Sequence, residues 1–274
     1  MAFPEMFQFS QGSLQDYADC PRRFQLRYVL MQPWPGLITE SPGQLEEHVQ
    51  RGAGFHRLAH QHALGLDPGR LAATIHDPTL ERWWQTYLAH PPPDLPETVR
   101  RAEAVVAASV AGYRLVAKLD LLAVEPGERL VIVDWKTTPK RPPRATLARR
   151  LQTRVYRYLA VEAGATFNGG RRLRPEQVEM VYWFAEDGGA TERFPYDADQ
   201  HAADRGYLAR LTAEIAAHQE PIWPLTPDEH QCRFCSYRSL CERGVKAGFL
   251  DDLDEDLEPP ELEIDLEQVA EIEF

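Results

Sequence analysis

One apolar run that ends in charged residues, RLVIVDWKTT at 129–138, constrains the fold more than any other part of the sequence. Leu130 to Val133 are aliphatic and mostly β-branched, and they predict a buried strand. Because side chains alternate along a strand, Asp134 and Lys136 lie on one face and Trp135 lies on the other. The two charges either form a solvated pair at the end of the strand, worth at most about 1 kcal/mol, or they have a chemical function.

A second run, LVAKLDLLAV at 115–124, predicts a neighbouring strand that carries Asp120. A turn at 125–128 separates the two runs, which suits an antiparallel pair. Facing residues of such a pair have a constant sum of residue numbers, so Asp120 and Asp134 share a face only where that sum is even. A two-residue turn gives an odd sum, and we therefore expect a loop of odd length or a bulge near Gly127.

With that register, two carboxylates and a lysine converge. Paired carboxylates on rigid strands suit a hard divalent cation such as Mg²⁺ or Mn²⁺. Lys136 could then orient or deprotonate a metal-bound water, or stabilise charge on a phosphate. His56 lies on a predicted helix that also carries His60 and His62. A zinc pair is one interpretation of these histidines, but we favour a single histidine that completes the carboxylate site.

The rest of the chain is typical of a mixed α/β protein without internal repeats. A helical opening segment is expected at 10–30, interrupted by Pro21. The range 104–132 has a strand-like pattern, and a further strand is expected at 178–184. Helices are expected at 45–64, 79–88, 144–163 and 202–217.

Four cysteines indicate a metal. Cys232, Cys235 and Cys241 form a C-x2-C-x5-C cluster, and Cys20 lies 212 residues before the first of them. In a cytosolic protein such clustering favours metal ligation over disulfides. Four thiolates suffice for a [4Fe–4S] cluster. Structural zinc is the alternative, although it usually takes two close pairs of cysteines. Either metal would join the two ends of the chain, and a redox role is a further interpretation.

Charge is distributed unevenly along the chain. The net charge is −12, but residues 251–274 hold 12 acids and no lysine or arginine, which leaves 30 acids and 30 bases in residues 1–250. We expect one domain at 1–250 and an acidic tail at 251–274 that is disordered, binds a partner or shields basic residues. The chain has no long apolar run and no secretory leader, so we expect a cytoplasmic protein without a membrane span.

A basic stretch follows Asp134. No acid occurs before Glu162, and tyrosines interleave with the bases. Such a pattern is usually a solvated helix face. Beside a metal site it predicts a track for single-stranded nucleic acid, in which phosphates contact the cations and bases stack on the rings. The DNA-binding candidates are Gln152, Tyr156, Arg149, Arg150 and Arg154.

Taken in their order along the chain, the sequence motifs resemble those of the PD-(D/E)XK nuclease superfamily. They are most similar to its RecB-like branch, which includes iron–sulfur nucleases of CRISPR adaptation and of helicase–nuclease complexes. The resemblance covers residues 10–243. One departure is Ala117, where members of the family often have glycine. The segments that carry the resemblance are LQDYADCPRRFQLRYVL, RGAGFH, AKLDLL, IVDWKT and QTRVY.

The resemblance implies a restriction-endonuclease-like α/β fold, in which helices flank a mixed central β-sheet. It also implies a helical iron–sulfur-bound cap that joins the N- and C-terminal segments. Catalysis is assigned by the resemblance to Asp120, Asp134 and Lys136. The implied metal ligands are His56, Asp120, Asp134 and the backbone carbonyl of Trp135. The implied ligands of a [4Fe–4S] cluster are Cys20, Cys232, Cys235 and Cys241.

The implied function is Mg²⁺- or Mn²⁺-dependent hydrolysis of phosphodiester bonds in DNA. We expect an exonuclease that acts on single-stranded DNA ends or on duplex ends, in DNA repair or CRISPR adaptation, with a helicase or adaptation protein as partner. The alternative is a nuclease-like subunit that grips DNA or a helicase without cleaving. The converging carboxylates argue against this alternative, because gripping phosphates requires cations.

Overall fold

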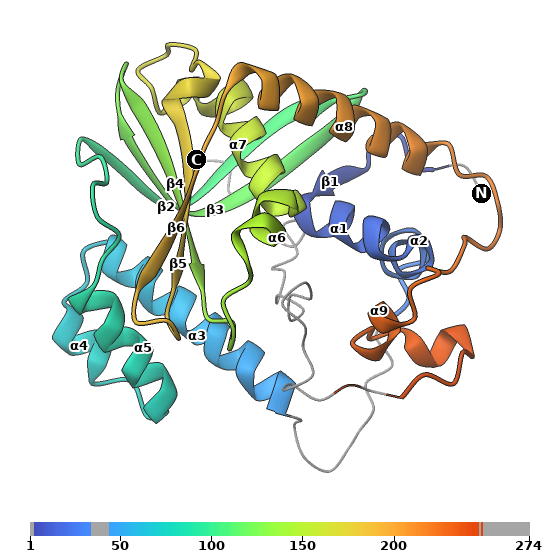
Figure 1. Cartoon of the computed structure of the whole chain (residues 1–274), viewed down its shortest axis with the longest axis horizontal. Coiled ribbons are helices and arrows are strands. Elements are labelled where there is room, and N and C mark those ends of the chain that lie inside the picture. The colour runs from blue at the N-terminus through green and yellow to red at the C-terminus, as the bar shows by residue number, and fades with distance from the viewer. Residues whose placement is uncertain (1–2, 34–43, 247, 249–274) are drawn as a thin grey trace, which may run out of the picture.

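The computed structural model describes residues 3–33, 44–246 and 248, so the predicted acidic tail at 251–274 lies outside the described residues. Within these ranges a mixed sheet of six strands forms the centre of the fold (Figure 1). The strands are β1 (Gln8–Ser10), β2 (Val99–Val110), β3 (Tyr113–Glu125), β4 (Arg129–Lys136), β5 (Val178–Phe184) and β6 (Ala190–Pro195).

Strand β3 organises the sheet because it pairs with three others. β2 runs antiparallel along one edge of β3 over nearly its whole length. On the other edge, β1 pairs in parallel with the beginning of β3, and β4 pairs antiparallel with its end. β5 continues the sheet parallel to β4, and β6 follows antiparallel to β5. The prediction of a mixed central sheet is therefore confirmed.

Helices flank this sheet, with α7 and α8 lying beside each other across it (Figure 1). The longer helices expected from the sequence are present, with ends displaced by a few residues at most positions. The helices are α1 (Gln11–Asp19), α2 (Pro21–Phe24), α3 (Gln44–Ala63), α4 (Pro68–Ala72), α5 (Pro78–Ala89), α6 (Arg144–Arg149), α7 (Leu151–Ala163), α8 (Ala198–Ala216) and α9 (His230–Arg233), with a π-helix at Gln25–Val29 and 3-10 turns at Gly164–Thr166, Pro175–Gln177 and Arg238–Cys241.

One predicted helix is broken, and the opening helical segment is interrupted where the sequence predicts it. The helix expected at 144–163 is broken at Arg150, whose ψ of 140° is extended. The hydroxyl of Thr153 donates to the carbonyl of Leu147 across this break, so a side chain replaces a helical backbone hydrogen bond. The opening segment at 10–30 is interrupted before Pro21, as predicted, because Cys20, which precedes the proline, is extended; its first residue, Ser10, ends β1.

The side chains of β4 alternate between the two faces of the sheet, and each face has its own hydrophobic core. Leu130 and Ile132 lie in the larger core, with apolar residues of α1, α7 and α8. Val131 and Val133 lie in a second core, with Phe55 of α3 and residues of α5. The sheet is thus covered by different helices on its two faces, and the carboxyl end of β4 lies between them.

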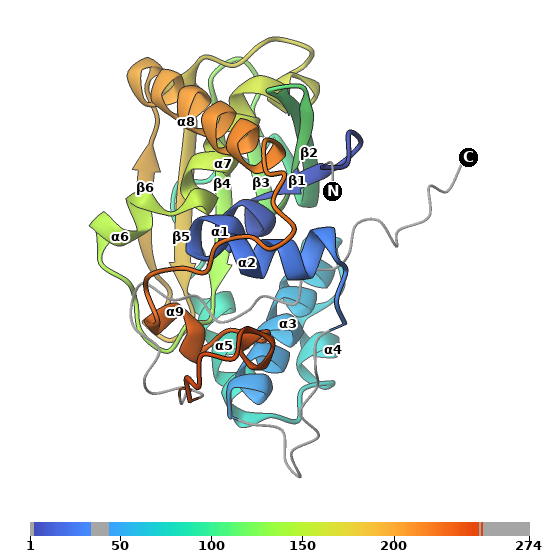
Figure 2. The ribbon, with the colours of Figure 1, turned by 90° about the vertical axis from the view of Figure 1, so that its right-hand side faces the viewer.

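The N-terminal helices and the C-terminal segment are joined directly. The carbonyl oxygen of the Gln25 side chain accepts a hydrogen bond from the backbone N–H of Trp223 at 2.9 Å, and its amide donates to Pro221 at 3.0 Å. The rings of Phe24 and Trp223 are stacked with centroids 5.6 Å apart. Figures 1 and 2 place α9 on the side of α1 and α2. These contacts bring the two cysteine-bearing segments into one region.

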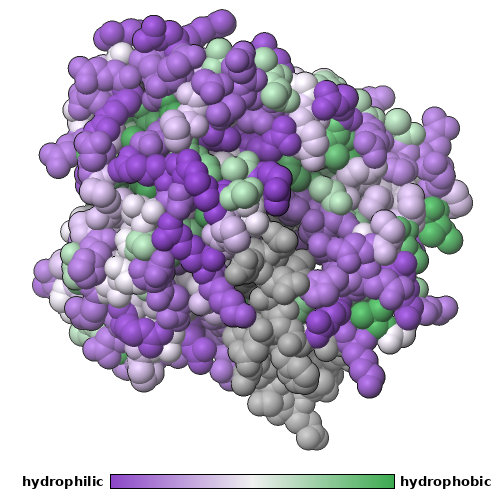
Figure 3. Space-filling view, viewed as in Figure 1, coloured by the Kyte–Doolittle hydropathy of each residue, from purple (hydrophilic) through white to green (hydrophobic). Residues whose placement is uncertain are grey.

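The face seen in Figure 3 is mostly hydrophilic, including the surface over α6 and α7. Within the described ranges, none of the helices combines the length and the apolar composition that a membrane crossing needs.

Candidate active site

The turn between β3 and β4 sets the register of the site. Leu121 faces Val133, and the pairing continues down to the turn with an even sum of residue numbers. The turn has three residues, 126–128, and Gly127 has a φ of 88°, in the left-handed region that glycine adopts without strain. The predicted loop of odd length near Gly127 is therefore confirmed.

The pairing of β3 with β4 ends beside Asp120 and Asp134. Continuing the register by one residue places these two aspartates opposite each other. Beyond that point β4 stays paired with β5 as far as Lys136, whereas the free edge of β3 is next occupied by β1 at Val116. The aspartates lie where β3 and β4 separate, and we call this place, with Asp120 and residues 134–136, the fork.

Asp120 is held by two groups at the fork. Its Oδ1 lies 3.2 Å from Nδ1 of His56 on α3, and its Oδ2 accepts a hydrogen bond from the backbone N–H of Trp135 at 2.9 Å. Burial raises the pKa of Asp120, but His56, the Trp135 N–H and the charge of Lys136 outweigh it and hold that pKa below the usual value. Asp120 is therefore ionised at neutral pH, as a metal ligand must be.

Asp134 is buried, with 3% of its surface exposed. Its Oδ2 lies 3.1 Å from Nζ of Lys136, and its Oδ1 accepts a hydrogen bond from the side-chain amide of Gln152 at 2.8 Å. The same amide lies 3.3 Å from the hydroxyl of Tyr156. Gln152 and Tyr156 therefore share one face of α7, as predicted, and that face is turned toward Asp134.

Tyr182 of β5 also belongs to the site, and sequence reasoning missed it. It lies opposite Asp134 in the parallel register of β4 and β5, and Nζ of Lys136 lies 5.6 Å from the centre of its ring. Its hydroxyl lies 2.6 Å from the hydroxyl of Thr153 and 3.4 Å from the side-chain oxygen of Gln152. The apolar run predicts the strand, but its pairing with β4 is a long-range contact that no local pattern contains.

The fork has donor atoms that suit a divalent cation: two carboxylates and an imidazole. Across the described part of the chain, however, no group of three or more histidine, cysteine, aspartate or glutamate side chains is arranged to hold a metal ion. Each carboxylate faces a basic side chain instead, Asp120 facing His56 and Asp134 facing Lys136. Metal ligation by these residues stays a prediction, as does ligation by the carbonyl of Trp135.

The four cysteines lie near one another as free thiols. Burial raises the pKa of Cys235 to about 11, and the neighbouring Cys20 and Cys241 contribute to this increase. Burial, Cys20 and Cys232 likewise raise the pKa of Cys241. Thiols that raise one another's pKa favour the protonated state, which a bound metal would reverse by stabilising thiolates. Within the described residues, however, these cysteines too form no group of three or more that is arranged to hold a metal ion, so metal ligation by them stays a prediction.

The predicted DNA-binding arginines have different surroundings. Arg149 is exposed and Arg150 is partly exposed, at the junction of α6 and α7. Arg154 instead makes an ion pair with Asp204 of α8, with Nε 2.5 Å from the carboxylate, and its guanidinium lies 3.9 Å from the ring centre of Tyr207. The surface near the fork is therefore less positive than the count of arginines suggests, because part of that charge is neutralised.

Comparisons with known proteins identify a similar family and similar structures. A profile of the PD-(D/E)XK nuclease superfamily matches residues 8–242. Among solved structures, a protein from Eubacterium rectale that is provisionally named an exonuclease is similar, with 9% identity, coverage of 88% of this chain and 90% of that chain, and a TM-score of 0.52. SSO0001 has 12% identity, coverage of 89% and 90%, and a TM-score of 0.43. A search among curated protein sequences finds no match.

The matched range contains every element of the fork. It begins at the first residue of β1 and ends just after Cys241, so it spans both core faces and both cysteine-bearing segments. The chain belongs to the PD-(D/E)XK nuclease superfamily.

Proposed function

We propose that the protein is a Mg²⁺- or Mn²⁺-dependent deoxyribonuclease that acts as an exonuclease on single-stranded DNA ends. The observation that carries the proposal is the fork, where Asp120 and Asp134 lie opposite each other in register and Lys136 contacts one of them. Hydrolysis of a phosphodiester requires negative charge to be stabilised as it develops on the phosphate. If the pair of Asp134 and Lys136 only stabilised the fold, it would need neither the carboxylate of Asp120 nor the lowered pKa of Asp120.

The chain's own residues have separable roles in this proposal. His56, Asp120, Asp134 and the carbonyl of Trp135 would hold the metal, which when bound supplies a Lewis acid and lowers the pKa of water. Lys136 stabilises charge on the scissile phosphate or orients the attacking water. Gln152 fixes the direction of Asp134 by its hydrogen bond.

Separate observations support the exonuclease action and the single-stranded substrate in this proposal. Exonuclease action is suggested by the name of the similar protein from Eubacterium rectale. A single-stranded DNA substrate is suggested by two arginines at the start of α7 that can contact phosphates: Arg149 is exposed, and Arg150 is partly exposed. Gln152 and Tyr156 have exposed fractions of 1% and 7%, so we assign them to positioning Asp134 rather than to stacking on bases.

We also propose that the four cysteines bind a [4Fe–4S] cluster in a cap that joins both ends of the domain. Cys20 ends α1, and the other three lie on or near α9. The contacts between Gln25 and Trp223 hold these segments together without a metal, which would pre-organise the ligands. As a RecB-like enzyme of the cytoplasm, the protein would work with a helicase or a CRISPR adaptation partner.

A subunit that grips DNA or a helicase without cleaving is the second candidate. It is favoured by the pairing of Asp134 with Lys136, both nearly buried, because this pair would satisfy the two charges without a metal. The two candidates differ in their expected response to Mn²⁺: the nuclease cleaves bound DNA when Mn²⁺ is added, and the binding subunit does not.

The test is digestion of end-labelled single-stranded DNA by anaerobically purified protein in Mn²⁺ and in EDTA. Asp134→Asn is compared with Asp94→Asn, which changes an exposed aspartate paired with Arg129. The proposal expects cleavage that requires Mn²⁺ and Asp134 and is kept in Asp94→Asn, and labels at either end report the polarity. Equal DNA binding without cleavage by the wild type and Asp134→Asn would establish the second candidate instead.

A further inference from the structure

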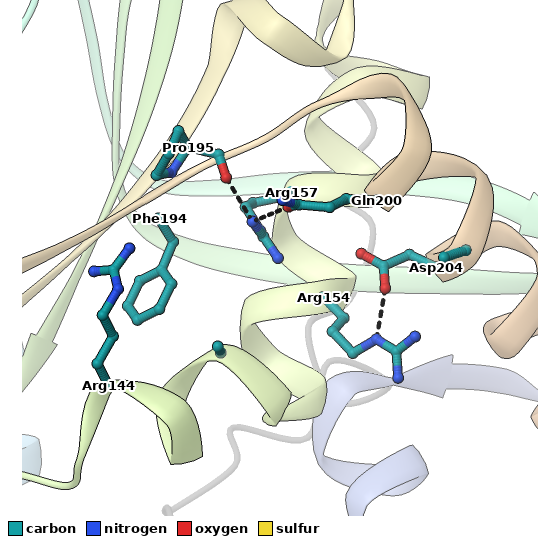
Figure 4. Close-up of a pocket in the computed structure, with 9 residues that line it drawn as sticks. Arg144, Arg154, Arg157, Phe194, Pro195, Gln200 and Asp204 are labelled. Atoms are coloured by element: carbon teal, nitrogen blue, oxygen red, sulfur yellow. Dashed lines mark hydrogen bonds and ion pairs between the residues drawn. The ribbon is translucent and has the colours of Figure 1, made fainter.

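A polar cavity lies beside α7, at the end of β6. Its volume is about 310 Å³, and it is formed by residues of α6, α7, β6 and α8 (Figure 4). Three arginines line it, Arg144, Arg154 and Arg157, together with Gln200 and a single carboxylate, Asp204. Three guanidinium groups around one cavity repel one another unless anions balance their charge.

Arg157 is the unusual member of this group. It is buried, with 6% of its surface exposed, and its side-chain hydrogen bonds go to neutral acceptors. Nε donates to the carbonyl of Thr153 at 2.9 Å, and Nη1 donates to Pro195 at 2.8 Å and to the side chain of Gln200 at 3.0 Å. Among the residues that the structure describes, no carboxylate lies within ion-pair distance of it. Burial lowers the pKa of Arg157, and the nearby Asp204, Tyr196 and Tyr182 offset only part of this effect.

The neighbouring carboxylates are engaged elsewhere. Asp204 accepts from Nε of Arg154 at 2.5 Å and from the hydroxyl of Tyr196 at 2.9 Å. Glu192, outside the lining, forms an ion pair with Arg144. Figure 4 shows Arg157 beside Gln200 and Pro195, and Asp204 directed toward Arg154. In the described part of the chain, Arg157 is therefore the one arginine of the three without an ion pair, and its guanidinium lies 4.5 Å from the ring centre of Tyr196.

We propose that this cavity binds a phosphate group. A guanidinium presents its donors in a fork that matches phosphate oxygens, and Arg144, Arg154 and Arg157 surround one space. The volume exceeds that of a phosphate ion and reaches the range of small-molecule sites, so part of a nucleotide can enter with it. The phosphate of a free nucleotide and the phosphate of a nucleic-acid strand share this chemistry.

The cavity is separate from the fork. Arg157 lies five residues after Gln152 on α7, and five steps of about 100° direct the two side chains roughly 140° apart. The two sites are connected through Thr153, whose carbonyl accepts from Arg157 and whose hydroxyl contacts Tyr182, and through the rings of Tyr182 and Phe194, whose centres lie 5.8 Å apart. Phosphate binding in the cavity therefore does not depend on whether the fork cleaves DNA.

The test measures binding by calorimetry in EDTA, with inorganic phosphate, deoxyadenosine monophosphate, and a short oligonucleotide with or without a 5′ phosphate. Ala203 and Ala202 are both exposed on α8, but only Ala203 lines the cavity. Ala203→Glu therefore places a carboxylate at the cavity, and Ala202→Glu is its matched control. Arg157→Gln removes the buried charge, and thermal unfolding checks that each variant is folded.

We expect Arg157→Gln to weaken phosphate-dependent binding by about tenfold or more, because it removes charge-assisted hydrogen bonds. Ala203→Glu should weaken it by a similar factor, because the new carboxylate repels the phosphate, while Ala202→Glu matches the wild type. Binding of phosphate and the mononucleotide assigns the cavity to free nucleotides. Binding of the oligonucleotides alone assigns it to strand phosphates. The proposal is overturned if the wild type binds none of these ligands, or if Ala203→Glu, folded as its control is, binds them as well as Ala202→Glu does.

Discussion

The side-chain amide of Gln152 donates a hydrogen bond of 2.8 Å to Asp134 and thereby joins α7 to β4 at the fork. The oxygen of the same side chain lies 3.4 Å from the hydroxyl of Tyr182. Gln152 has an exposed fraction of 1%, so both ends of its amide are used inside the protein. Gln152 is therefore a positioning residue that determines which way Asp134 points.

Gln152→Leu should reduce the rate of DNA cleavage by a larger factor than the loss of folded protein accounts for. The change removes a donor from buried Asp134, and an unsatisfied buried acceptor costs about 1–3 kcal/mol. Gln177→Leu is the matched control, because that amide bonds turn carbonyls away from the fork. Cleavage rates at saturating Mn²⁺ and urea unfolding of both variants provide the measurement. A wild-type rate in Gln152→Leu would show that the amide does not position Asp134.

Lys136→Met should make the stability of the protein depend on metal. Asp134 and Lys136 form a buried pair, and removing one partner of such a pair costs about 3–5 kcal/mol. A divalent cation at the fork would replace the missing charge. Mn²⁺ should therefore raise the unfolding temperature of Lys136→Met by more than that of the wild type. Equal increases would place the Mn²⁺ site away from Asp134.

Trp135→Phe should lower stability and leave cleavage nearly unchanged. The indole lies in the second core, with its ring centre 5.6 Å from that of Trp183, on the face of β4 away from Asp134. The substitution removes buried apolar surface and costs about 1–3 kcal/mol, but it keeps the backbone at the fork. Thermal unfolding and the cleavage rate below the unfolding transition are measured together. A rate loss far beyond the loss of folded protein would contradict a packing role.

The fork could be predicted because its determinants are local in sequence. The alternation of Asp134, Trp135 and Lys136 follows from strand geometry, and the parity of the β3–β4 register required a loop of odd length, which the turn at 126–128 provides. Helical spacing likewise predicted that Gln152 and Tyr156 face one way.

What could not be predicted depends on long-range pairing. β1 and β6 are short, and neither has a pattern that distinguishes it from a loop. Tyr182 joins the site only because β5 is the parallel neighbour of β4. The break at Arg150 depends on a side-chain hydrogen bond from Thr153, and the neutralisation of Arg154 depends on α8 packing beside α7. Each of these contacts joins residues whose proximity only the fold establishes.

Cys241→Ser should reduce the iron bound by anaerobically purified protein and lower its unfolding temperature. Metal binding to thiolates contributes to folding, so a lost ligand weakens both. Ser239→Ala, an exposed change in the same 3-10 turn, is the control. Metal analysis and visible absorption report the centre. Zinc in place of iron in the wild type would contradict the cluster while keeping a four-thiolate site, and the absence of both metals would contradict any centre.

Glu192→Gln should remove part of the acid sensitivity of folding. Burial raises the pKa of Glu192, but the guanidinium groups of Arg144 and Arg141 outweigh burial and hold that pKa below its usual value. A carboxyl group with a lower pKa in the folded than in the unfolded state stabilises the protein above its unfolded pKa, about 4.3. This stability is lost as the pH falls through the folded-state pKa. The wild type should therefore be more stable than Glu192→Gln at pH 7, and the difference should shrink below about pH 4. Unfolding by urea from pH 7 to pH 3 measures it, and a difference that stays constant over this range would show that the ion pairs of Glu192 do not contribute to stability.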